Sequence, residues 1–260
     1  MPAPPEIQPS ARQTGCYVYG IVPVDVKVNS GVYGIDKREI RLVRCGAVAA
    51  LVSDVDLPGP LGTPENLRSH QGILDSSITD LPVMPVRFGA ILASEHAVVE
   101  ELLEPHHDQF VAALEELDGC AEYLVKGRYI EHAIMAEILS QDRGAAQLSS
   151  RIRGTDADAA RGPRSRLEEL ISNSIAAKRE EDTRLLLSAM EGHSEASFVR
   201  DPAHELDAVH VAFLLDVSKA DELERAAGEL GGRWEGRVVL RVLGPMAPYD
   251  FAGIAQEPQG

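Results

Sequence analysis

Three side chains of this sequence, an imidazole, a guanidinium and a carboxylate, belong to the types that build acid–base or anion-binding sites. They are His70, Arg87 and Glu122, and each falls in or beside a predicted helix or strand of the first half of the chain. The same residues also suit a structural role, with Arg87 and Glu122 as a buried ion pair and His70 hydrogen-bonded nearby. Because no nucleophile or substrate pocket is indicated nearby, we favour the structural interpretation.

Motifs for other common chemistries are missing from the sequence. It has no Gly-x-Ser-x-Gly nucleophile elbow, no Gly-x-Gly-x-x-Gly loop and no Gly-Lys-Ser/Thr loop. His106 and His107 are adjacent, and neighbouring helical residues do not share a face, so they are unsuited to one metal ion. Cysteines are few, widely spaced and set in apolar segments, as free thiols of a reducing compartment are: Cys16, Cys45 and Cys120. We therefore expect no cofactor and no enzymatic activity.

Length and charge restrict the kind of protein further. The chain has 260 residues, enough for two domains, and a formal net charge of −16 from 41 acidic and 25 basic residues. Nucleic acids and anionic membranes both require a basic surface, so neither is an expected partner. The sequence has no apolar run long enough to cross a bilayer and does not begin like a signal peptide, which predicts a cytoplasmic protein.

Residues 81–89 carry Arg87, and their pattern predicts a strand at the edge of a sheet. The apolar run contains Pro82 and Pro85, and proline lacks the amide donor that an interior strand needs. An arginine among apolar neighbours also needs partners for its guanidinium donors. The segment is therefore either an edge strand with a structural ion pair or a working surface.

Capping residues mark helices around this segment. Thr63 followed by Pro64 predicts the start of one helix, which carries His70 on its apolar face. Ser94 predicts the start of another helix, which Pro105 interrupts. Apolar and β-branched runs complete this part of the chain with strands at 16–22, 38–44, 46–53 and 120–125 and a helix at 129–141. The strands at 38–44 and 46–53 are predicted to form a hairpin around Cys45-Gly46.

A change in composition predicts the domain boundary. Residues 143–164 are rich in arginine and glycine and poor in large apolar side chains, and we interpret them as a linker. This divides the chain into an N-terminal α+β domain at 15–142 and a C-terminal region at 165–251. Residues 1–14, with several prolines, and residues 252–260 are predicted to be flexible tails.

The C-terminal region begins with a long charged helix at 164–191, which either bridges the domains or packs on the second one. An interior strand at 209–217, a helix ending at Gly231-Gly232 and a strand at 238–242 follow. The simplest arrangement of this unit is a right-handed crossover between parallel neighbours. Residues 244–251 then hold an extended, proline-rich segment, either a strap packed over the last sheet or a rigid surface for a partner.

Taken in order, several of these segments resemble the gas vesicle protein F/L family, over residues from about Cys16 to Phe251. Met246, Ala247 and Asp250 depart from the tryptophan, proline and serine that are usual in the family's closing motif. The segments that carry the resemblance are Tyr17 to Val22, Ala49 to Ser53, His70, Leu81 to Gly89, Glu122 and Gly244 to Phe251.

The resemblance implies a two-domain α+β protein whose C-terminal domain is a modified ferredoxin-like fold, with the long helix near the domain junction. It also implies a non-enzymatic gas vesicle accessory or minor structural protein, associated with the vesicle in the cytoplasm. Expected partners are the major shell protein and other accessory proteins. The candidate contact residues are Arg87, Phe88, Pro245, Met246, Pro248, Tyr249 and Phe251.

Two other functions remain open from the residues alone. One is a cytoplasmic ligand-binding or regulatory module, which the ferredoxin-like half would suit. The other is an enzyme built on His70, Arg87 and Glu122.

Overall fold

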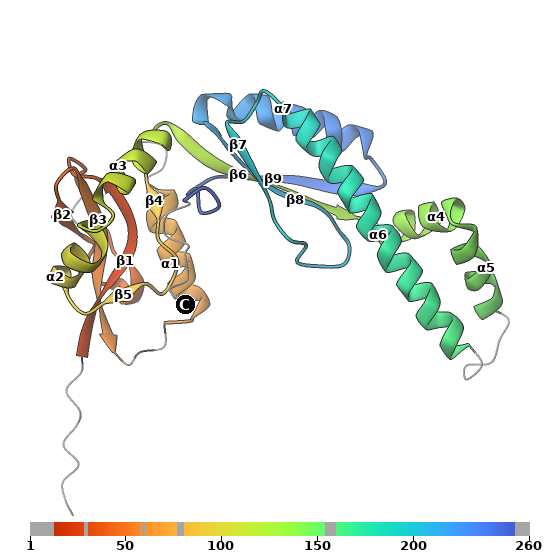
Figure 1. The fold of residues 1–260 in the computed structure, drawn as a ribbon, viewed down its shortest axis with the longest axis horizontal. Coiled ribbons are helices and arrows are strands. Elements are labelled where there is room, and N and C mark those ends of the chain that lie inside the picture. The colour runs from red at the N-terminus through yellow and green to blue at the C-terminus, as the bar shows by residue number, and fades with distance from the viewer. Residues whose placement is uncertain are drawn as a thin grey trace, which may run out of the picture. The chain divides into compact units, whose positions relative to one another are not determined.

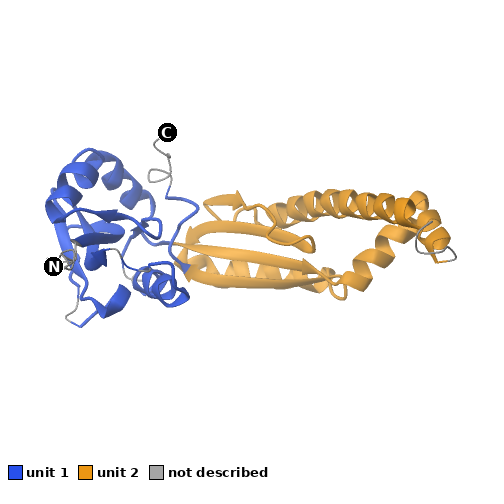
Figure 2. Ribbon diagram, turned by 90° about the horizontal axis from the view of Figure 1, so that it is seen from below, with its two compact units in different colours: residues 1–120, 246–260 blue, residues 121–245 orange. Residues whose placement is uncertain are grey.

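The protein consists of two compact units, each with its own sheet (Figures 1 and 2). The computed structural model describes residues 13–28, 31–57, 59, 61–76, 81–153 and 160–252. Unit 1 comprises the chain up to Cys120 together with the segment from Met246 onward, and unit 2 comprises Ala121–Pro245. The units thus divide after Cys120 and not at the linker expected at 143–164, and the chain returns to unit 1 at its end.

Unit 1 is built on an antiparallel sheet in the order β2-β3-β1-β4, with β5 also paired to β1. The predicted hairpin is confirmed, because Cys45 pairs with Val48 and Gly46 takes a positive φ of 56° in the turn. The strands are β1 (Gln13–Pro23), β2 (Arg41–Cys45), β3 (Val48–Leu57), β4 (Met84–Pro85) and β5 (Ile91–Leu92). Because β1 begins at Gln13, the last two residues of the expected N-terminal tail belong to the sheet.

The predicted helix starts of unit 1 are confirmed. The Thr63 side chain accepts a hydrogen bond from the Asn66 amide, and the Ser94 side chain accepts one from the Ala97 amide. Pro105 lies in the turn between two helical segments, as its missing amide donor requires. The helical segments are η1 (Ile35–Lys37), α1 (Pro64–Asp75), α2 (Glu95–Ala97), η2 (Val98–Leu103) and α3 (His107–Glu116).

Segment 81–89 lies at the edge of this sheet, as predicted, but only Met84 and Pro85 form a strand. They pair with Ile21 and Gly20 of β1, and the Val86 amide donates to the Tyr19 carbonyl at 2.9 Å. Pro82 and Pro85 have no amide hydrogen to extend the ladder, which explains why the strand is short.

Unit 2 contains a sheet in the order β7-β8-β6-β9. The strands are β6 (Cys120–Tyr129), β7 (Ala196–Val199), β8 (Asp207–Asp216) and β9 (Val238–Met246). The expectation that β8 is interior is confirmed, but the expectation that β8 and β9 are direct neighbours is wrong, because β6 lies between them. Strand β6 is an interior strand beside β8, and its residues Ala121–Val125 are buried throughout.

The helices of unit 2 are α4 (Glu131–Gln141), α5 (Arg143–Ile152), α6 (Arg161–Met190), η3 (Val217–Lys219) and α7 (Ala220–Arg233). Most of the expected linker is therefore helical. Its arginines lie on the exposed sides of α5 and α6, which explains why its composition resembles that of a linker. The long helix is confirmed and packs on β8 and α7 of its own unit. Helix α7 continues through Gly231-Gly232 to Arg233, because Trp234 follows as a buried anchor.

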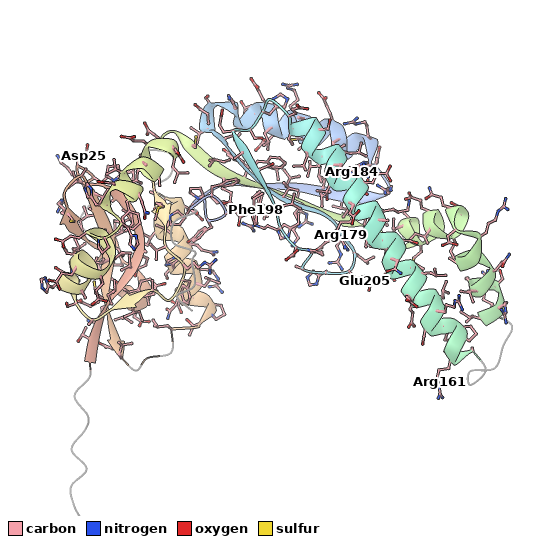
Figure 3. All side chains as sticks on the ribbon, viewed as in Figure 1. Asp25, Arg161, Arg179, Arg184, Phe198 and Glu205 are labelled. Atoms are coloured by element: carbon pink, nitrogen blue, oxygen red, sulfur yellow. The ribbon has the colours of Figure 1, made fainter. Side chains whose placement is uncertain are left out.

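The α+β fold is confirmed for the described residues, whereas the ferredoxin-like description of unit 2 stays a prediction. The Tyr129 amide at the end of β6 donates a hydrogen bond to the Leu206 carbonyl just before β8, and the Ile130 amide donates to the Arg237 carbonyl just before β9. The end of β6 thus lies beside the starts of β8 and β9, so β6 runs antiparallel to both neighbours. Arg179 of α6 donates to the carbonyls of Asp207 and Glu205 at 2.7 and 2.6 Å and fixes the helix to the start of β8 (Figure 3).

A buried polar network joins the helices of unit 2 to its sheet. Asp182 of α6 is 3% exposed and accepts hydrogen bonds from the Tyr129 hydroxyl at 2.6 Å and from Arg237 at 2.9 Å. Arg237 also donates to Glu137 of α4 at 2.7 Å. Burial and the Asp182 carboxylate raise the pKa of Tyr129, so the phenol stays protonated and acts as a donor.

We predict that Asp182→Ala lowers the free energy of unfolding of unit 2 by about 3 kcal/mol. The substitution removes one of the two carboxylate partners of Arg237, whose guanidinium is partly buried. Chemical denaturation followed by circular dichroism measures the change. The neighbouring exposed carboxylate provides the control, and Glu181→Ala should change stability by less than about 0.5 kcal/mol. Equal effects of the two substitutions would contradict the role given to Asp182.

Candidate protein interaction site

His70 lies at the centre of a buried aromatic cluster in unit 1. Helix α1 carries it against β1, where its Nδ1 and the Tyr17 hydroxyl share a hydrogen bond at 3.0 Å. The Tyr17 oxygen in turn accepts from the Gly89 amide at 3.0 Å. The imidazole also stacks on Tyr19, with ring centroids 5.6 Å apart and an interplanar angle of 24°.

The environment of His70 keeps the imidazole neutral. Burial lowers its pKa to about 4. Burial likewise raises the pKa of Tyr17 to about 12. Neither group titrates near neutral pH, where a general acid or base is most effective.

The proline-rich segment near the C-terminus packs against this cluster as a strap. The Ala247 amide donates to the Asp75 carboxylate at 2.9 Å, and the Tyr249 ring lies 6.3 Å from the His70 ring. Ala247 and Pro248 are buried. The segment is therefore a strap, one of the two alternatives that the sequence left open, and it packs on α1 of unit 1.

Unit 1 holds most of the candidate contact residues, at different depths. Arg87 is exposed, and Phe88 is half-buried with its ring edge 5.6 Å from His70. Met246, Tyr249 and Phe251 are also half-buried. Pro245 is the last residue of unit 2.

The predicted partner of Glu122 is wrong. Glu122 belongs to unit 2, where its fully buried carboxylate accepts a hydrogen bond from Arg200 at 2.8 Å. Arg87 is exposed in unit 1. Arg87 and Arg200 each end a short apolar run. The local sequence pattern therefore does not show which of the two arginines pairs with Glu122.

These positions do not assemble the acid–base constellation that the sequence left open as an alternative. His70 is neutral and enclosed by aromatic rings, and Glu122 is bonded to Arg200. In the described parts of the chain, no three His, Cys, Asp or Glu side chains gather to hold a metal ion. None of the described helices has the length and apolarity needed to cross a membrane.

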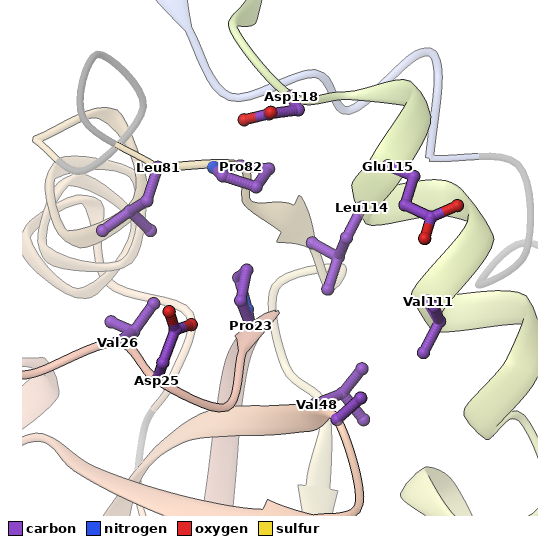
Figure 4. A pocket seen from close by; sticks show the side chains of 11 residues that line it. Pro23, Asp25, Val26, Val48, Leu81, Pro82, Val111, Leu114, Glu115 and Asp118 are labelled. Carbon is purple, nitrogen blue, oxygen red and sulfur yellow. The ribbon is translucent and has the colours of Figure 1, made fainter.

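A groove on unit 1 offers a binding surface that the sequence patterns did not indicate. It encloses about 440 Å³, and its apolar side chains include Pro23, Val26, Leu81, Pro82 and Leu114 (Figure 4). They come from β1 and the chain after it, from segment 81–89 and from α3. Because these residues are distant in sequence, only Leu81 and Pro82 fell in a segment that the sequence singled out.

Three carboxylates surround the groove. Asp25 lies across the hollow from Glu115 and Asp118 (Figure 4). All three side chains are exposed, and within the described residues none has a hydrogen bond or ion pair. An apolar bed with an acidic rim suits an apolar segment flanked by lysine or arginine.

Comparison with known proteins defines the class of this chain. A family model described as "Gas vesicle synthesis protein GvpL/GvpF" matches residues 15–253. The chain belongs to this family, as the resemblance predicted, and a role in gas vesicle formation follows from the membership.

Relatives match the chain along most of its length. Gas vesicle protein F of Streptomyces sp. (strain CB03234) is 29% identical over 247 residues, covering 90% of this chain and 98% of the relative. Gas vesicle protein L of the same strain is 29% identical over 273 residues, covering 93% and 94%.

Solved structures share the fold. The crystal structure of the gas vesicle protein GvpF from Anabaena sp. PCC7120 has a TM-score of 0.77 and 21% identity, covering 93% of this chain and 99% of that chain. The crystal structure of gas vesicle protein GvpF from Microcystis aeruginosa has a TM-score of 0.72 and 18% identity, covering 92% and 98%.

We predict that His70 makes unit 1 less stable in acid. Its pKa of about 4 in the folded state lies below the ordinary 6.5, so the unfolded chain binds more protons between these values. Stability should fall as the pH drops from 6.5 towards 4, by roughly 3 kcal/mol in total from this residue.

Denaturation of unit 1 at a series of pH values measures this dependence. His70→Gln should flatten the curve between pH 6.5 and 4, whereas His96→Gln, at an exposed histidine of the same unit, should leave it nearly unchanged. If His70→Gln kept the full slope, another group would be responsible.

Proposed function

We propose that this chain is a non-enzymatic assembly protein that binds the major gas vesicle shell protein through the groove of unit 1. The observation that carries the proposal is the combination of an apolar bed with an unpaired acidic rim, formed by Asp25, Glu115 and Asp118. The groove is lined by Leu81 and Pro82, which belong to a segment that carries the family resemblance.

The physical problem of vesicle assembly suits such a groove. A shell subunit that will line a gas space exposes apolar surface before it is incorporated, and that surface promotes aggregation. A bed of prolines and aliphatic side chains covers an apolar segment, while the rim selects segments with basic residues at their ends. The net charge of −16 keeps the bound complex soluble.

The residues of the resemblance provide a second contact surface on the same unit. Exposed Arg87 and half-buried Phe88, Tyr249 and Phe251 present a cation and aromatic edges. Arginine and aromatic residues contribute strongly to protein interfaces. We propose that these residues contact the shell protein or another accessory protein beside the groove, in the cytoplasm.

The ligand-binding alternative rests on a pocket of unit 2. It encloses about 520 Å³ between α6 and β7–β8, and its lining includes Arg184, Asp207 and His210. The Asp207 side chain is buried, and its Oδ2 accepts two backbone amides, from Ala203 and His204. A small polar ligand in this pocket would make the chain a regulatory module.

Glu115→Lys is expected to weaken co-purification with the shell protein about tenfold, because the substitution replaces attraction at the rim by repulsion. Pull-down from a mixture of the two purified proteins measures the bound fraction. Glu116→Lys makes the same charge change at an exposed neighbour outside the groove lining and should bind like the wild type. Equal binding by both folded variants would rule out the groove.

Arg87→Ala and Phe251→Ala separate the second surface from the groove in the same assay. We expect each to reduce binding, since truncating an arginine or aromatic contact commonly costs more than about 1 kcal/mol at an interface. Binding that is unaffected by both substitutions, yet reduced by Glu115→Lys, would restrict the interface to the groove.

A further inference from the structure

Among the described residues, the helices of unit 2 lie on one face of its sheet (Figure 1). Tyr129 points to that face, because its hydroxyl bonds Asp182 of α6. Tyr123 points there as well, since burial and then the Glu224 and Asp221 carboxylates of α7 raise its pKa. Side chains alternate along a strand, so Glu122, Leu124, Lys126 and Arg128 of β6 point to the opposite face, which we call the open face.

The close approach of β9 to Gly127 of β6 shows which face of the sheet each β9 side chain occupies. A Cβ on Gly127 would lie 3.1 Å from Val238 and 3.2 Å from Leu240, so these two side chains share the helix-covered face with Gly127. Val239, Arg241 and Leu243 alternate with them and therefore belong to the open face. On β7, Arg200 reaches Glu122, which places Phe198 on the same face two residues earlier.

Large apolar side chains stand out from the open face into solvent. Phe198, labelled in Figure 3, is 48% exposed, Val239 is 48% exposed and Leu243 is 46% exposed. They come from the two outer strands of the sheet. An apolar group of this kind on one face marks an interaction surface.

The charged side chains that β6 and β9 place on the open face are mostly basic, unlike those of the whole chain, and Asp216 at the end of β8 is a carboxylate on the same face. Lys126, Arg128 and Arg241 have no ion pair within the described residues. Arg200 neutralises the one carboxylate of β6 on this face, Glu122. Burial lowers the pKa of His210, and the cations Arg200 and Lys126 act in the same direction, whereas the hydrogen bond with the Asp201 carbonyl and the Asp207 carboxylate oppose them.

We propose that the open face of unit 2 binds an acidic amphipathic segment of a partner protein, with carboxylates at Lys126, Arg128 and Arg241 and apolar side chains against Phe198, Val239 and Leu243. Charge complementarity selects this occupant. The groove of unit 1, with its acidic rim, would repel the same segment. The open face therefore acts independently of the groove.

The composition of the open face argues against a nucleic acid. Single-stranded nucleic acids stack their bases on several aromatic side chains, and Phe198 is the aromatic side chain that β7 contributes to this face. Exposed valine and leucine gain nothing from phosphates. The net charge of −16 also repels a polyanion at long range, whereas a short peptide carries little charge.

Fluorescence anisotropy with the full chain tests the proposal. The probe is a labelled helical peptide with leucine on one side and glutamate on the other, and its twin carries lysine in place of glutamate. In a Glu115→Lys background, which removes the attraction of the unit 1 groove for the lysine twin, the chain should bind the glutamate peptide, more weakly at higher salt, and should bind the lysine twin at least about tenfold more weakly.

Matched variants locate the site. Arg128→Glu with Arg241→Glu should lower affinity for the glutamate peptide by about tenfold or more, while Arg164→Glu with Arg166→Glu on α6 makes the same charge change and should have little effect. Phe198→Ser should also weaken binding, and its control is Leu185→Ser on α6, which is 47% exposed in the wild type. Circular dichroism melts confirm that each variant is folded.

Several results would overturn the proposal. They are the absence of binding by the wild type, equal effects of the test and control variants, and displacement of the peptide by a single-stranded oligonucleotide. A dimer in sedimentation that the Arg128→Glu and Arg241→Glu substitutions dissociate would instead assign the face to a second copy of the chain.

Discussion

The hydrogen bonds of two buried tyrosine hydroxyls fix the arrangement of unit 1. The Tyr17 hydroxyl connects β1 to His70 and to the Gly89 amide, while the Tyr19 hydroxyl accepts from the Ile35 amide at 2.9 Å and shares a hydrogen bond with Ser53 at 2.8 Å. A buried hydroxyl without a partner costs about 1 to 3 kcal/mol, so these contacts constrain helix α1, strand β3 and segment 81–89 together. Segment 81–89, which contributes Leu81 and Pro82 to the groove, and the strap that packs on α1 both depend on that constraint.

This network explains why weak, scattered motifs together indicated the family. Tyr17, Tyr19, His70, Phe88 and Tyr249 come from distant parts of the sequence, yet they form one aromatic cluster. Each residue type is required by its neighbours: a hydroxyl beside an imidazole, and flat rings that stack around it. The resemblance therefore reports on a packed core of unit 1 more directly than on a binding surface.

Features set by neighbouring residues were predictable from the sequence, and features set by distant ones were not. The helix caps at Thr63 and Ser94 and the turn at Gly46 depend on a few adjacent residues, and all were expected. The partner of Glu122, the central place of β6 and the acidic groove depend on pairings across many residues, which local patterns do not encode. Composition misled the domain boundary because arginine-rich exposed helices resemble a linker.

Net charge alone hides how this chain distributes its charges. The formal net charge of the chain is −16, and unpaired carboxylates form the acidic rim of the groove on unit 1. The open face of unit 2 nevertheless carries several unpaired cations. If each surface binds the segment proposed for it, charge alone would let one chain discriminate between two kinds of partner. Because the chain passes between the units twice, at Cys120 and at Met246, both partners stay tethered to one molecule. Tethering raises the effective concentration of one partner near the other, which favours ordered assembly even when each contact is weak.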